Sequence, residues 1–122
     1  MKHTYTKRVA SYVEAELGNA RRSRSVGDTQ QEFIHLERAH VLGQESTYWH
    51  VKVHVSMLLW ATRNRSVRET LGQIFRIVGA ATKTAFGLVP QGNTGGANVS
   101  PFKKMPIEPE LATLIHRAKS AI

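Results

Sequence analysis

The sequence contains no cysteine, and this absence excludes disulfide bonds and thiolate metal sites. No stretch approaches the roughly 20 consecutive apolar residues that a membrane span needs. The first eight residues carry charges with no apolar run after them, which predicts neither a signal peptide nor an anchor. We therefore expect a cytoplasmic protein with no membrane partner.

Acidic residues are also scarce, because 9 Asp and Glu stand against 17 Lys and Arg, giving a formal net charge of +8. Such a charge attracts nucleic acid or acidic proteins. A solvated, solubilising surface explains the same charge, and no aromatic residues interleave with the basic ones to stack bases. The candidate partner-binding residues come in two clusters: Arg21, Arg22 and Arg24, then Arg63, Arg65 and Arg68.

Apolar residues recur at helical spacing, which predicts an all-α fold within one domain of 122 residues. Asp28 followed by Gln31, and Ser66 followed by Glu69, are capping-box patterns that start helices. The helix predicted to begin at Ser66 carries an apolar face that we expect in the core. This face consists of Val67, Leu71, Ile74, Phe75 and Val78. The predicted segments are a hairpin over about 5–42, a hairpin over about 46–86, an extended arm over 88–107 and a C-terminal helix over 108–121.

The two hairpins resemble each other when they are overlaid with Ser25 on Ser66, 41 residues apart. Stacked helical hairpins of this length are typical of tetratricopeptide-like or HEAT-like repeats. The ends of so short a stack need covering. The C-terminal helix is one candidate cover, and a homodimer is the other.

Four of the six histidines lie within twenty residues, and the overlay separates them. His50 and His54 fall on Val9 and Val13, and His40 falls on Ala81, all of which are predicted core positions. His35 falls on Arg76 and is expected to point outward. Glu37 shares the face of His40 because residues three apart on a helix lie side by side.

Three inward imidazoles and a carboxylate suit zinc or iron, so the predicted metal ligands are His40, His50, His54 and Glu37. Glu16 falls on Met57 and is an additional candidate ligand. Two other interpretations stay open: an internally hydrogen-bonded network and an acid/base pair. The HExxH protease motif is absent, since Val-Lys-Val separates His50 from His54.

A glycine-rich segment follows the second hairpin. Its glycines would allow successive N–H groups to bind an anion. It lacks the Gly-Lys-Ser/Thr end of a P-loop, and we favour an arm that packs closely on the helices. The candidate residues are Gly92, Asn93, Thr94, Gly95, Gly96 and Asn98. Of these, Asn93, Thr94 and Asn98 are candidates to hydrogen-bond into the histidine cluster.

Three stretches, HLERAHVLGQ, HVKVH and VPQGNTGGANVSPFKKMPIEPEL, resemble a bacterial family of uncharacterised proteins, domain of unknown function 3703. The resemblance covers nearly the whole chain and implies a compact bacterial protein. It implies no established activity, so no functional residue follows from it.

The function predicted from the sequence is transition-metal binding through the inward His/Glu cluster. The alternative is a helical adaptor that binds an acidic protein or nucleic acid through its basic residues. We do not expect an enzyme. Metal-assisted hydrolysis is the one reaction that the cluster suits, and it would need an open coordination position.

Overall fold

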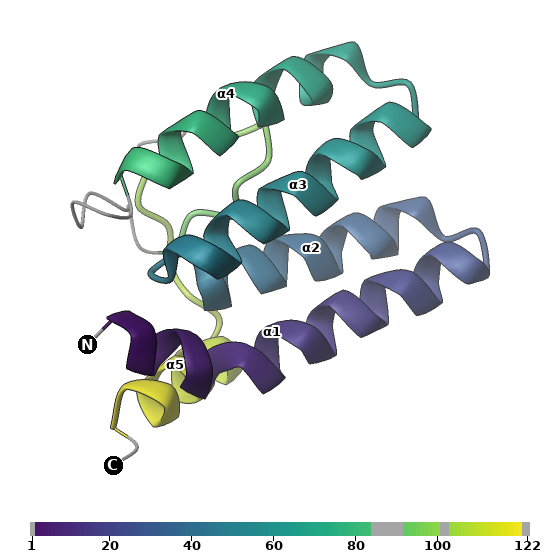
Figure 1. Ribbon diagram of the computed structural model, residues 1–122. Helices are drawn as coiled ribbons and strands as arrows, with labels where there is room; N and C mark the ends of the chain where they lie inside the picture. Colours follow the sequence, from purple (N-terminus) through teal and green to yellow (C-terminus); the bar gives the residue numbers. More distant parts are fainter. Residues whose placement is uncertain (1, 84–91, 101–102, 121–122) are drawn as a thin grey trace.

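The structure is a computed structural model that describes residues 2–83, 92–100 and 103–120. Its described residues form helices and no strand, which confirms the all-α prediction (Figure 1). The predicted end of the fourth helix, near residue 86, lies outside the described residues. The helices are α1 (Lys2–Ser25), α2 (Thr29–Gly43), α3 (Thr47–Arg63), α4 (Val67–Lys83) and α5 (Pro109–Ser120).

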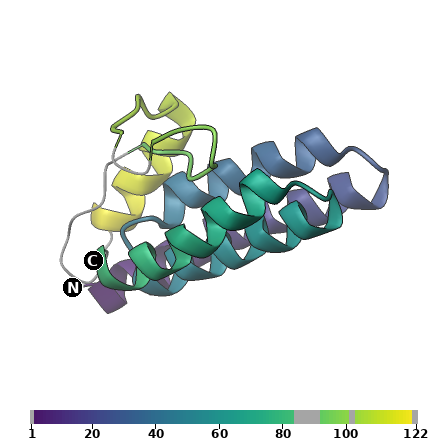
Figure 2. The same cartoon turned by 90° about the horizontal axis from the view of Figure 1, so that it is seen from above.

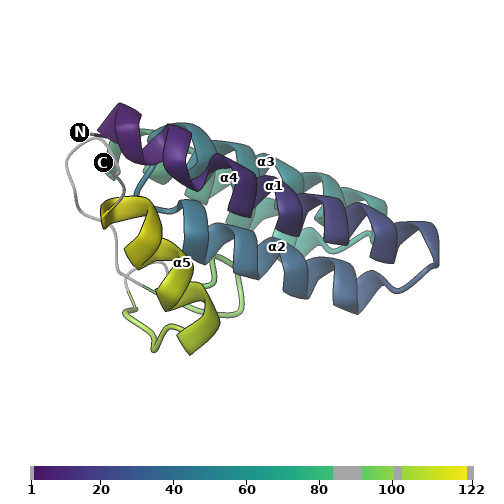
Figure 3. The ribbon, with the colours of Figure 1, turned by 90° about the horizontal axis from the view of Figure 1, so that it is seen from below.

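The first four helices form two stacked antiparallel hairpins, α1–α2 and α3–α4, with α2 packed against α3 (Figures 1 and 2). The predicted stack is therefore confirmed. Helix α5 packs against α1 and α2, on the side of the stack away from α4 (Figure 3). The C-terminal helix thus covers one end of the stack, as expected, and leaves α4 at the other.

Side-chain caps and left-handed residues set the two hairpin turns. Asp28 accepts a hydrogen bond from the Gln31 backbone N–H at 3.0 Å, and Ser66 accepts one from Glu69 at 3.2 Å. Gly27 and Arg65 precede these caps with φ values of 78° and 56°. The two turns therefore match at a spacing of 38 residues, three fewer than in the sequence overlay. The overlay matches buried Val9 and Val13 with buried His50 and His54. Ala81, which it matches with His40, is exposed, so its predicted core position was wrong.

The hydrophobic core lies between α1, α2, α3 and α5, where Val9, Val13, Leu42 and Val53 are fully buried. The Tyr5 hydroxyl donates to the Leu42 carbonyl at 2.9 Å, fixing the start of α1 against the end of α2. No described helix is long and apolar enough to cross a membrane.

Helix α4 contradicts one prediction. Its apolar face, expected in the core, is 50–71% exposed at Val67, Leu71, Ile74, Phe75 and Val78. The inward side of α4 instead carries fully buried Gln73 together with Ala80. Helical periodicity shows which residues share a face, but it does not show which neighbour covers that face.

Candidate metal centre

Three histidines from two helices meet in the interior. His40 is one turn from the end of α2, and His50 and His54 are one turn apart on α3. They are 3%, 7% and 2% exposed. The Nε2 atom of His40 lies 3.1 Å from Nε2 of His50 and 3.1 Å from Nε2 of His54. Among the described residues, these three form the group of candidate ligands whose donor atoms all lie within 4.8 Å of one another.

The arm fixes the proton on His40. Nδ1 of His40 lies 2.6 Å from the backbone carbonyl oxygen of Asn93. A carbonyl oxygen only accepts hydrogen bonds, so Nδ1 carries the hydrogen and donates it. In neutral His40 the other ring nitrogen, Nε2, therefore presents a lone pair toward His50 and His54.

Helix α4 fixes the proton on His54 in the same way. The Gln73 side-chain amide nitrogen donates to the carboxylate of Glu69 at 2.6 Å and to the carbonyl of Gly95 at 2.9 Å. Both partners are acceptors, so the amide orientation is settled and Oε1 of Gln73 faces His54. Nδ1 of His54 donates to this oxygen at 2.6 Å, and Nε2 of His54 presents a lone pair toward His40.

Burial keeps these rings neutral. Burial lowers the pKa of His40 well below its usual range, and the neighbouring His54 and His50 add to the shift. Burial also lowers the pKa of His54 to about 4. Two neutral rings thus direct nitrogen lone pairs at each other across 3.1 Å, an arrangement that repels unless a cation lies between them. The spacing is close to the ~3.3 Å edge of a tetrahedral site with Zn–N bonds of ~2.0–2.1 Å.

The arm reaches His40 only because residue 95 is glycine. Gly95 has φ 85°, and a Cβ atom there would lie 2.5–2.8 Å from the His40 ring atoms. The buried side chain of Asn93 orders the arm, since its amide donates to the carbonyls of Ser100 and Lys103. Its oxygen accepts from the Gly95 N–H at 2.9 Å. The glycine-rich segment therefore holds a histidine in place.

Two backbone N–H groups that could have held an anion are taken by the chain itself. The Gly95 N–H serves Asn93, and the Ala97 N–H donates to the Glu69 carboxylate. Gly72 of α4 packs closely against this arm, because a Cβ atom there would lie 2.6 Å from that of Ala97. Thr94 lines a cavity, and Asn98 is exposed. These contacts favour the packing interpretation of the segment.

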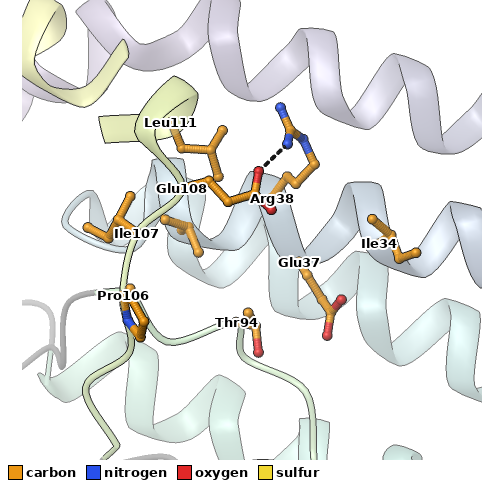
Figure 4. A pocket seen from close by; sticks show the side chains of 10 residues that line it. Ile34, Glu37, Arg38, Thr94, Pro106, Ile107, Glu108 and Leu111 are labelled. Carbon is orange, nitrogen blue, oxygen red and sulfur yellow. Dashed lines mark hydrogen bonds and ion pairs between the residues drawn. The ribbon is translucent and has the colours of Figure 1, made fainter. Parts of the chain in front are cut away.

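Glu37, the fourth predicted ligand, lines a cavity of about 120 Å³ between α2 and the arm (Figure 4). In the close-up its carboxyl group and the Thr94 side chain extend toward the same side of the cavity. Burial, with Glu69 nearby as the second cause, raises the pKa of Glu37 to about 7. The structure thus brings together the three predicted histidine ligands and places Glu37 in this cavity.

Glu16, the additional candidate, belongs to a different cluster. Its carboxylate accepts from Nδ1 of His35 at 2.7 Å and from Nε of Arg38 at 3.0 Å, both on α2. The Arg38 guanidinium continues to Glu108 and Glu110, which ties the start of α5 to α2. His35 is half-buried in this network, so its expected outward position was wrong.

Of the two residues that orient the histidines, sequence reasoning missed Gln73, whereas Asn93 was expected to hydrogen-bond into the cluster. A signal existed for Gln73. It follows Glu69 by four residues on α4, and the overlay placed it on Glu32, a buried and paired carboxylate. Asn93 reaches His40 through its backbone oxygen, an atom that the sequence pattern does not single out.

The predicted basic residues gather at one end of the stack, where both hairpin turns lie (Figure 1). Arg63 is partly engaged there, because its guanidinium pairs with the buried Glu32 carboxylate at 2.8 Å. Binding of an acidic partner at this end stays a prediction. The other five residues are exposed: Arg21, Arg22, Arg24, Arg65 and Arg68.

Comparison with known proteins returned no match among curated proteins or solved structures. One family, described as a protein of unknown function (DUF3703), matches residues 7–115. This range spans most of α1, the whole of α2, α3 and α4, and the arm. It therefore includes all three histidines and the residues that orient two of them. The family description assigns no activity, and the chain belongs to this family of unknown function.

Proposed function

We propose that the protein binds one transition-metal ion through the Nε2 atoms of His40, His50 and His54. The observation that carries the proposal is the fixed direction of two ring protons. Asn93 and Gln73 hold the Nδ1 hydrogens of His40 and His54, so both Nε2 lone pairs converge. Metal-ligating histidines are oriented by such outer hydrogen bonds.

The donor set favours zinc or iron. Imidazole nitrogen suits these ions, whereas magnesium and calcium prefer oxygen ligands. Three histidines leave a fourth position, which in catalytic zinc sites holds water or substrate. Here the three side chains are at most 7% exposed, and this burial supports a site that retains its ion rather than one that turns over a substrate.

The same contacts weigh against the two alternatives. In a purely hydrogen-bonded network, one ring of the His40–His54 pair would have to carry a second proton between the two Nε2 atoms. Burial opposes that charge, as the lowered pKa of each ring shows. An acid/base pair at this position would face the same cost and would also need access for a substrate.

The test is a thermal-unfolding measurement on tag-free protein stripped with a chelator and then titrated with zinc. A ligand of the native state raises its stability by about 2.7 kcal/mol at 100 times the dissociation constant, a rise on the order of 10 °C in Tm. We expect this rise in the wild-type chain and its loss in His54→Ala.

Two variants serve as controls, and both should keep the response to zinc. His116→Ala removes an exposed histidine on α5. Glu37→Gln removes the cavity carboxylate, which the proposal leaves outside the ligand set. If zinc and ferrous iron leave the wild-type Tm unchanged, or if His54→Ala responds as the wild type does, the proposal is wrong.

A further inference from the structure

The outer face of α4 carries an uncovered apolar stripe. Its spacing alternates four and three residues through Val67, Leu71, Ile74 and Val78, with Phe75 alongside. All five side chains are at least half exposed. This is the heptad pattern of helices that pack lengthwise against another helix. We call these five residues the α4 stripe.

The stripe is large for a chain of this size. Helix α3 packs beside α4 and adds exposed Val55 and Leu59. A fully exposed side chain of this kind offers ~130 Å² of apolar surface. Because the seven are 40–71% exposed, together they present on the order of 500 Å². Monomers rarely expose contiguous apolar patches above a few hundred Å². An exposed apolar patch of this size is typical of an interaction surface.

The position of α4 in the fold explains why the stripe is bare. Helix α5 packs against α1 and α2 and covers that side of the stack. Among the described residues, the arm contacts α4 near Gly72, Gln73 and Arg76, on its inward and lateral sides. Stacked hairpins need a cover at each end, and the α4 end has none within the described chain.

We propose that the α4 stripe is the interface of a homodimer, in which two α3–α4 hairpins meet across a two-fold axis as a four-helix bundle. A two-fold axis brings the same surface patch of both copies into contact. The α4 stripe suits this arrangement because its side chains are uncharged and do not repel their own copies. A stable interface buries about 800 Å² per partner, and homodimer interfaces are about 65% apolar. The stripe with Val55 and Leu59 supplies that apolar share.

The charges around the α4 stripe predict how dimerisation depends on salt concentration. Glu69 is the one acidic residue of α3 and α4, and its carboxylate is already held by Gln73 and the Ala97 N–H. The exposed charges beside the stripe, including Lys52 and Arg68, are basic. Two copies bring like charges together, so dimerisation should strengthen as salt screens them. An acidic helical partner would show the opposite dependence.

The test is sedimentation equilibrium of the full chain at concentrations up to about 100 µM, a range in which micromolar association is resolved. We expect the wild type to sediment at twice its 13.6 kDa mass, with a dissociation constant that falls as salt is raised. Leu71→Glu and Phe75→Glu should be folded monomers by circular dichroism, because both positions are exposed in the single chain.

Val26→Glu is the matched control, because Val26 is 79% exposed in the α1–α2 turn, away from the stripe, and this variant should stay dimeric. A monomeric wild type would overturn the proposal and leave the stripe to another segment or partner. A dimer that survives both stripe variants, or one that dissociates as salt rises, would overturn it equally.

Discussion

At the scale of single residues, the site depends on hydrogen bonds whose two ends are far apart in the sequence. The three histidines could be selected from the sequence, because helical spacing placed them on inward faces. The groups that orient them could not be. The carbonyl of Asn93 lies 53 residues from His40, and nothing local to either residue shows that they meet. Gln73 faces His54 only because α4 packs on α3.

Gly95 gives the sharpest test at this scale. Gly95→Ala should destabilise the protein for two reasons. Alanine is strained at a φ of 85°, and its Cβ atom would overlap the His40 ring. The left-handed backbone alone costs roughly 1 kcal/mol, and overpacking adds roughly 1–3 kcal/mol. Urea unfolding measures the total loss in the free energy of unfolding. The affinity for zinc should also fall, because the added Cβ atom displaces His40.

Gly27→Ala isolates the backbone cost. Gly27 has φ 78° in the α1–α2 turn, and nothing lies within 4 Å of an added Cβ atom there. This variant should lose roughly 1 kcal/mol and keep its zinc affinity. Equal losses of stability in the two variants would mean that Gly95 does not support His40 by close approach.

At the scale of elements, the helices could be predicted because their caps and breakers are local. Asp28, Ser46 and Ser66 each bond a backbone N–H three residues ahead, so the signal lies within one turn. The orientation of α4 could not be predicted in this way, because its apolar stripe looked like a core face. The left-handed residue of the α3–α4 turn is Arg65, a residue type that gives no local signal for this conformation.

The position of Glu37 between α2 and the arm sets up a pH dependence. Burial, and secondarily Glu69, raises the pKa of Glu37 from 4.5 to about 7. The folded state therefore holds this proton more tightly than the unfolded chain does. Its contribution to stability is full below pH 4.5 and is lost as pH rises through 7. In Glu37→Gln the side chain does not titrate, so this loss of stability with rising pH is absent.

Urea unfolding of wild type and Glu37→Gln at pH 5 and pH 8 measures the effect. The free energy of unfolding of the variant, relative to wild type, should be higher at pH 8 than at pH 5. We expect a difference of roughly 1–2 kcal/mol, since each pKa unit is worth about 1.4 kcal/mol and solvent screens a half-buried group. The same difference at both pH values would contradict a protonated Glu37 in the folded state.

At the scale of the whole molecule, the stack has two unlike ends and a polar centre. Helix α5 covers one end, the α4 stripe leaves the other bare, and the histidines lie between the hairpins where α2 meets α3. The described part of the arm contacts α4 and supplies Asn93 and Gly95 to this centre. A buried cluster of three histidines, in which the tautomers of His40 and His54 are fixed, is the feature of the molecule that most requires a cation.

Elemental analysis of protein purified without a His-tag and without added metal tests this claim most directly. Three converging imidazoles, two of them oriented by outer hydrogen bonds, should retain a transition metal through purification. We predict about one zinc or iron per wild-type chain and a stoichiometry near zero in His54→Ala. Wild-type protein that is free of transition metal, and that takes none up from zinc or ferrous iron after dialysis, would contradict the account.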